Sequence, residues 1–140
     1  MEVSRHGDVL IIRMHPGEEI VTSMVDACRN ENAVTAVVLS SIGQLRDFTL
    51  GFFVEKGNYD PVRFSEPHEL LSISGMIIRT SEGFEPHLHA CLAGRSRSAV
   101  GGHLIGGTVS ITNETVIQLN IGPADREFNS ETGLKDLKPL

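Results

Sequence analysis

Cysteine and large aromatic residues are scarce in this chain of 140 residues. Cysteine occurs only as Cys28 and Cys91, too few for the disulfide framework that stabilises small secreted proteins. Tryptophan is absent and tyrosine occurs once, so a core must consist mainly of aliphatic side chains and the six phenylalanines. The chain is long enough to bury one such core. We therefore expect residues 1–140 to form a single domain.

Long hydrophobic runs are missing as well. The densest early run, "VLIIRM", is short and contains Arg13, whereas a membrane-spanning helix needs about 20 apolar residues. The amino-terminal stretch "MEVSRHGDVL" carries Glu2 and Asp8 and lacks the apolar segment of a signal peptide. We expect a cytoplasmic protein that does not act at a membrane.

Positive charge is in deficit. Twelve Lys and Arg residues face eighteen Asp and Glu residues, for a formal charge of -6. A protein that grips DNA over a wide surface needs a basic face to displace counterions from the phosphates. The only basic concentration is Arg95 with Arg97, which we interpret as a solvated turn. Tight binding of duplex DNA by this chain alone is therefore not expected.

One strand and one helix are predicted near the amino terminus. Residues 8–14 ("DVLIIRM") indicate a buried strand, and residues 15–32 ("HPGEEIVTSMVDACRNEN") indicate a helix. Glu18 and Glu19 place negative charge in the expected first turn, where the helix dipole favours it. The apolar residues that recur at helical spacing are Ile20, Met24, Ala27 and Cys28. On this interpretation Cys28 belongs to the core.

From residue 34 onward the pattern indicates strands separated by turns. "SIGQL" and "KGNYDP" are expected to be turns, and the tail "GPADREFNSETGLKDLKPL" is expected to be irregular, packed back on the body through Phe128, Leu134 and Leu137. The predicted strands are "VTAVVLS", "RDFTLGFFVE", "VRF", "ELLSISGMIIRT", "HLHACLA" and "GTVSITNETVIQLNI". One early helix followed by many strands predicts an α+β fold with a largely antiparallel sheet.

Three of the six histidines lie within the stretch "EPHLHACLAGRSRSAVGGHL". If "HLHACLA" and "AVGGHLI" form a hairpin with the loop "GRSRS", its centre is Ser96. His89 and His103, each seven residues from Ser96, then lie directly opposite each other. Alternation along the strands places His87, His89, Cys91 and His103 on one face and the apolar Leu88, Ala90 and Leu92 on the other.

The candidate metal ligands are His87, His89 and His103. Directly opposed side chains start about 5 Å apart at Cβ, close enough for the imidazoles to converge on one ion. Three imidazoles suit zinc, and also copper, iron or nickel. Three protein ligands with an open fourth position are typical of a catalytic or ligand-accepting zinc, and water or a small anion could occupy that position.

Several alternatives stay open at this stage. Cys91 could close the site as a thiolate, and Glu85 or Glu69 could orient an imidazole through a hydrogen bond. In the non-functional interpretation, His87 and His89 cap a strand end and His103 packs against glycines. The other histidines, at positions 6, 15 and 68, have no such companions.

The sequence also resembles a known family. "SIGQL", "ELLSISG", "HLHACLA", "GGHLIGGTV" and "REFNSETGL" occur in the order and spacing of the plants-and-prokaryotes-conserved (PPC) domain, from Gly17 to about Leu137. The resemblance implies an antiparallel sheet flanked by helices and assembly into homotrimers. In plants the domain follows an AT-hook that binds DNA, while the PPC domain assembles the trimer and binds transcription factors. Free-standing prokaryotic forms, commonly labelled DNA-binding by association, look like this chain, and its histidines fit those forms.

The chain departs from the plant pattern at two places. It lacks the Arg-Gly-Arg-Pro core of an AT-hook. The plant partner-binding stretch Gly-Arg-Phe-Glu-Ile-Leu corresponds to "EPHELL" at residues 66–71, where only Glu69 and Leu71 match. The resemblance therefore does not carry partner binding through that stretch to this chain.

Two classes of function fit these observations. The first is a non-enzymatic homotrimeric binding module whose zinc is structural or accepts a small ligand. The second is a hydrolase or lyase that uses a zinc-bound water. A general base beside the site would favour the enzyme, and the candidates are Glu85, Glu69 and Glu114. We favour the module.

Overall fold

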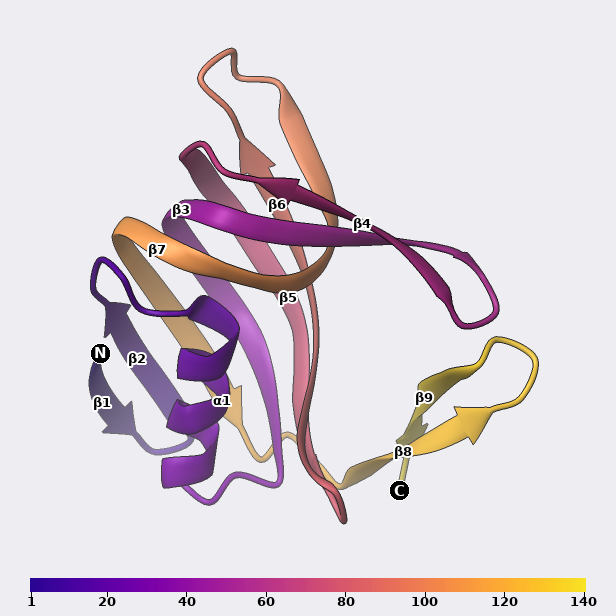
Figure 1. Ribbon diagram of the computed structural model, residues 1–140. Helices are drawn as coiled ribbons and strands as arrows, with labels where there is room; N and C mark the ends of the chain where they lie inside the picture. Colours follow the sequence, from indigo (N-terminus) through magenta and orange to yellow (C-terminus); the bar gives the residue numbers. More distant parts are fainter.

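The computed structural model describes residues 1–140 and consists of nine strands and one helix (Figure 1). In chain order the elements are β1 (Glu2–His6), β2 (Val9–Met14), α1 (Ile20–Asn30), β3 (Thr35–Glu55), β4 (Asn58–Phe64), β5 (His68–Thr80), β6 (Gly83–Ala93), β7 (Ala99–Leu119), β8 (Ala124–Asn129) and β9 (Leu134–Pro139). No helix has the length and hydrophobicity needed to cross a bilayer.

Seven of the strands form one antiparallel sheet in the order β1-β2-β7-β6-β5-β3-β4. The first residues of β7 pair with β6, residues 103–119 of β7 pair with β3, and residues 113–118 also pair with β2. Because β3 also pairs with β5, and β5 with β6, the pairings β7-β6-β5-β3 close on themselves. The prediction of a mostly antiparallel sheet is confirmed.

The strand β3 runs through "SIGQL", so the predicted turn there is wrong. Register shifts between Val38 and Ser40 and between Gly43 and Leu45 take up extra residues without ending the pairing with β7. Gly43 has φ of 149°, a conformation that glycine adopts at little cost. The turn-forming residues of "SIGQL" therefore form bulges that bend a long strand.

The single helix α1 lies across one face of the sheet (Figure 1). Its N-cap is Glu19, whose carboxylate accepts a hydrogen bond from the backbone N–H of Thr22 and another from that of Gly107. Glu18 and Glu19 thus precede the first turn instead of lying within it. The expectation of a sheet flanked by several helices is wrong, because the carboxyl-terminal segments form strands.

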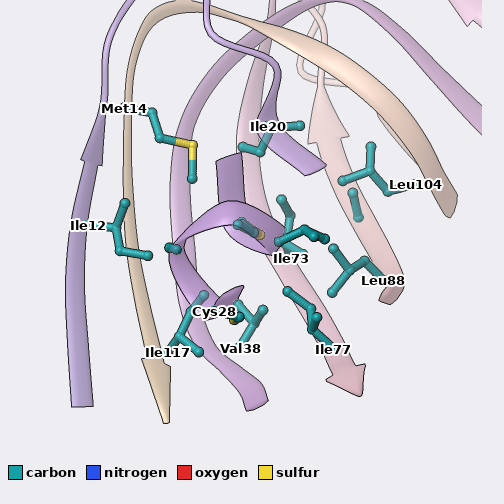
Figure 2. Packing of buried hydrophobic residues seen from close by; sticks show 14 of the residues in the cluster. Ile12, Met14, Ile20, Cys28, Val38, Ile73, Ile77, Leu88, Leu104 and Ile117 are labelled. Atoms are coloured by element: carbon teal, nitrogen blue, oxygen red, sulfur yellow. The ribbon is translucent and has the colours of Figure 1, made fainter. Parts of the chain in front are cut away.

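The core lies between α1 and the sheet. Figure 2 shows Ile20 and Cys28 of the helix facing Ile12 and Met14 of β2 and Ile117 of β7. All five side chains are almost fully buried. Burial raises the pKa of the Cys28 thiol to about 11, so this cysteine is an apolar core residue, as predicted.

The other face of the sheet carries exposed apolar side chains. Val3, Ile11 and Ile42 are about half exposed and line a groove of about 530 Å³ formed by β1, β2, β3 and β7. Ile11 alternates with the buried Leu10 and Ile12, so it points away from α1. This apolar face has no partner within the chain.

The tail forms a separate hairpin of β8 and β9, so the prediction that it is irregular is wrong. Lys135 of β9 ties it to the main sheet through ion pairs with Glu82 and Glu85. Its turn approaches the turn between β3 and β4, where Gly133 lies against the backbone of Gly57. Figure 1 shows the two hairpin tips on the same side of the molecule.

Candidate metal centre

The hairpin of β6 and β7 has the predicted register. His89 pairs directly with His103, and Ala93 with Ala99 next to the loop. Arg95 and Arg97 lie in that loop and are exposed, as expected of a solvated turn. The interpretation that His87 and His89 cap a strand end is wrong, because both lie inside β6.

The predicted division into two faces is also confirmed. Leu88, Ala90 and Leu92 are at most 5% exposed and belong to the core. His87 and His89 are exposed and His103 is half-buried on the opposite face. The alternation of a strand therefore anchors β6 through its apolar side chains and presents the imidazoles together.

The three imidazoles surround one point. One nitrogen from each of His87, His89 and His103 lies within 4.8 Å of the other two. The Nε2 atoms of His87 and His89 are 3.3 Å apart. Two nitrogens bound tetrahedrally to one zinc at about 2.0–2.1 Å are themselves about 3.3 Å apart, so this pair already has the required spacing.

Burial and a missing hydrogen-bond partner favour the neutral, metal-binding form of these imidazoles. The Nδ1 atom of His103 is buried and has no hydrogen-bond partner. Desolvation lowers the pKa of His87 and of His103, assisted by the positive charge of Arg126 at His87 and by the neighbouring imidazoles at both. Neutral imidazole is the form that binds metal, and the residues present fit a divalent ion.

The same pKa shifts predict that the metal-free protein loses stability on acidification. Because the folded-state pKa values of His87 and His103 lie below the unfolded value of about 6.5, the unfolded chain takes up protons first as the pH falls, and the free energy of unfolding decreases. With a chelator present, the urea midpoint should be lower at about pH 5.5 than at about pH 7.5. Replacing both residues with Gln should flatten this dependence; an equally steep profile would contradict the assignment.

Backbone contacts between strands help to set the position of β6. Gly75 of β5 pairs with Leu88 and has φ of 137°. A Cβ at this position would collide with the carbonyl oxygen of His87 and lie 2.9 Å from the Cα of Leu88. The absence of a side chain at Gly75 thus lets β5 approach the backbone that carries the first histidine.

A pocket of about 440 Å³ opens beside the histidines. Its walls come from β4, β6, β7 and the carboxyl-terminal hairpin, and its lining residues are Tyr59, Glu85, Pro86, His87, His103, Ile105, Arg126, Leu134 and Lys135. A second hollow of about 240 Å³ shares His87 and Arg126 with it and adds His89. An ion held by the three imidazoles would therefore face open space that can admit a ligand.

The other candidate residues lie in different surroundings. Cys91 is half-buried and is not part of the histidine group. Of the three glutamates, only Glu85 lines the pocket, where it accepts hydrogen bonds from Thr80 and Lys135 that lower its pKa. Glu69 binds Gln44, and Glu114 borders the apolar groove of β1 and β2.

The remaining histidines lie outside the group, as expected. His6 contacts Ser4, His15 pairs with Glu2, and His68 packs edge-on against two phenylalanines. Sequence reasoning missed Tyr59 and Arg126, whose place in the pocket depends on two hairpins far apart in the chain. The charged and apolar alternation of "REFN" could at least have indicated a strand at Arg126.

Comparison with known proteins identifies the family. The sequence pattern of the Plants and Prokaryotes Conserved (PCC) domain, also abbreviated PPC, matches residues 1–120. The chain belongs to the PCC domain family. No curated protein matches it. The PCC match includes all three histidines and ends before the carboxyl-terminal hairpin.

Solved structures extend this similarity to nearly the whole chain. A PPC protein from Pyrococcus horikoshii has a TM-score of 0.84 and 26% identity, over 99% of this chain and 94% of that one. A protein from Bacteroides thetaiotaomicron, provisionally described as DNA-binding, has a TM-score of 0.92 and 25% identity, over 98% and 96% of the two chains. A metal-containing protein from Archaeoglobus fulgidus has a TM-score of 0.81 and 26% identity, over 96% and 94%. The PCC fold of this chain thus includes β8 and β9.

Proposed function

We propose that this PCC domain, formed by residues 1–140, is a cytoplasmic homotrimeric binding module that holds one zinc ion through His87, His89 and His103. The observation that carries the proposal is the convergence of three imidazole nitrogens beside an open pocket. The metal-containing relative from Archaeoglobus fulgidus supports it. Other divalent transition metals share the preference for imidazole.

The open fourth position decides what such an ion can do. Three protein ligands leave room for water or a small anion, as in zinc sites that accept a ligand. When bound, zinc supplies a Lewis acid that polarises an oxygen atom placed on it. His87 and His89 would hold the ion from β6, and His103 would hold it from β7.

The surroundings of Glu85 favour the binding module over a hydrolase or lyase. Its carboxylate is the only one that lines the pocket, and it is engaged by Thr80 and Lys135. These contacts lower its pKa, whereas a general base works best with a pKa near the working pH. Glu85 is therefore a poor proton acceptor for an attacking water.

The exposed apolar face supports the trimer. Val3, Ile11 and Ile42 leave a hydrophobic groove uncovered, and apolar surface of this kind marks protein interfaces. Two further copies of the chain are the partners that we propose for it. Any association with DNA would then pass through other proteins, because the net charge is -6 and the basic loop is small.

Analysis of tag-free protein tests the assembly and the metal together. Sedimentation equilibrium should give three times the chain mass of 15.2 kDa, and elemental analysis should give one zinc per chain. Ile42→Asp should dissociate the trimer, because it places a charge in the apolar groove. Phe128→Asp, an equally drastic change at an exposed site on β8, should not. A monomeric, metal-free wild type would refute the proposal.

A further inference from the structure

The pocket beside the histidines contains one cation without an ionic partner. Lys135 is paired with Glu82 and Glu85, but Arg126 forms no salt bridge, and its guanidinium takes part in no hydrogen bond within the chain. The side chain is nevertheless half-buried. It borders both hollows that contain His87. An arginine in such a place offers its donors to something outside the chain.

The charge of the pocket specifies an anion. Arg126 lines both hollows that contain His87, and Glu85 lines the larger of the two. A divalent ion on the histidines would add two positive charges, against the single carboxylate of Glu85, which Lys135 already compensates. A guanidinium binds a carboxylate or phosphate through two parallel hydrogen bonds. A ligand with negative charge therefore satisfies Arg126 and the metal at once.

The rest of the lining indicates a carbon skeleton on that anion. Ile105 and Leu134 are the aliphatic side chains of the pocket, and Pro86 and the ring of Tyr59 complete its apolar part. The volume of about 440 Å³ lies at the lower end of the range for small-molecule sites. These dimensions and surfaces fit a short organic acid better than a bare inorganic ion.

We propose that Arg126 is the anchoring residue for a small organic acid, an inference that rests on the proposed function. The carboxylate of this ligand binds the guanidinium of Arg126, and a second oxygen of the same molecule would face the metal that the histidines hold. The metal ligands come from the β6–β7 hairpin and the anchor from the β8–β9 hairpin. The second hairpin is thus a wall of the binding site whose charged residues select the ligand.

Calorimetric titration of the zinc-loaded protein with L-malate, a small hydroxy-dicarboxylate, tests the anchor. Arg126→Ala should weaken malate binding about tenfold to a hundredfold, the effect of removing a hydrogen bond between charged groups. The malate affinity of Arg126→Lys should lie between those of the wild type and Arg126→Ala, because lysine keeps the charge and lacks the planar guanidinium. Arg95→Ala is the matched control, since Arg95 is exposed in the β6–β7 loop, and it should bind malate like the wild type.

The metal content and melting temperature of every sample are measured alongside. Metal content should be unchanged in Arg126→Ala, because Arg126 is not among the proposed ligands, and Tm should change little, because the guanidinium makes no salt bridge within the chain. Equal malate affinity in wild type and Arg126→Ala overturns the inference, as does equal binding of the uncharged diamide of malate. A protein that binds phosphate but does not bind malate overturns the assignment of the ligand as an organic acid. Wild-type protein that takes up no zinc overturns the proposed function itself, a result read from elemental analysis and not from calorimetry.

Discussion

Alanine in place of any one of His87, His89 and His103 is expected to release most of the bound metal. In the proposed site each histidine supplies one of only three protein ligands, so its loss should weaken metal binding by more than the 10–100-fold that removal of an outer partner causes, as an order of magnitude. Elemental analysis after dialysis should show occupancy falling from one ion per chain to near zero. His103→Ala should have the largest effect, because its imidazole is the most buried of the three.

Thermal stability gives a second measurement of the same loss. An ion that binds only the folded chain stabilises it by about 2.7 kcal/mol at a free concentration of 100 times Kd. In a chain of this size that is worth a rise of several degrees in Tm, on the order of 5–15 °C. In each alanine variant, added zinc should no longer raise Tm, whereas Tm without zinc should stay close to that of the metal-free wild type.

His6→Ala and His68→Ala are the matched controls. Both residues lie outside the histidine group, so both variants should bind a full complement of metal. His68→Ala should lower Tm through the loss of its contacts with Phe48 and Phe64, without changing the response to zinc. Full metal content in the triple alanine variant would show that the cluster is coincidental.

Gly75→Ala is expected to destabilise the fold more than any other added methyl group in the region of the site. Its φ of 137° is unfavourable for any L residue, at a cost of about 1–3 kcal/mol. The added Cβ also meets the backbone of β6, and overpacking of this kind costs a further 1–3 kcal/mol or so. We expect the free energy of unfolding to fall by about 2–6 kcal/mol and Tm by about 10 °C or more.

The matched control is Gly7→Ala. Gly7 also has a positive φ, of 60°, but a Cβ there meets nothing within 4 Å, so only the conformational cost of about 1–2 kcal/mol applies. Comparing the free energies of unfolding of the two variants by urea denaturation separates the cost of the backbone conformation from the cost of the steric collision. Zinc affinity should fall in Gly75→Ala alone, because the collision displaces the strand segment that carries His87. Equal destabilisation by the two substitutions would contradict the close approach of β5 and β6.

Alternation and loop symmetry were enough to predict which three histidines lie together. The pairing of His89 with His103 follows from a hairpin centred on Ser96, and the burial of Leu88 and Leu92 follows from the period of a strand. Both arguments are local, since they use only neighbouring residues and one short loop. That is why the histidine face of the site was correctly predicted.

The parts that were not predicted depend on contacts between distant segments. "SIGQL" has the composition of a turn, yet β7 and β5 pair on both sides of it and hold Gly43 in a bulged strand. Phe52 continues the alternation of buried Phe48 and Leu50, yet it is 72% exposed because the β3–β4 hairpin projects beyond the core. Arg126 enters the pocket from the β8–β9 hairpin, which Lys135 joins to β6 through its ion pair with Glu85.

The β6–β7 hairpin also sets an order of events during folding. All three histidines fall within seventeen consecutive residues, on two strand segments joined by one short loop. Hairpins form in about 1–10 μs, whereas the pairing of β3 with β7 joins residues far apart in sequence and must await slow loop closure. During synthesis, His103 emerges before residues 104–119, which make nearly all of the pairing of β7 with β3. If the three histidines hold zinc as proposed, the nascent β6–β7 hairpin would carry every protein ligand of the ion before the remaining strands assemble.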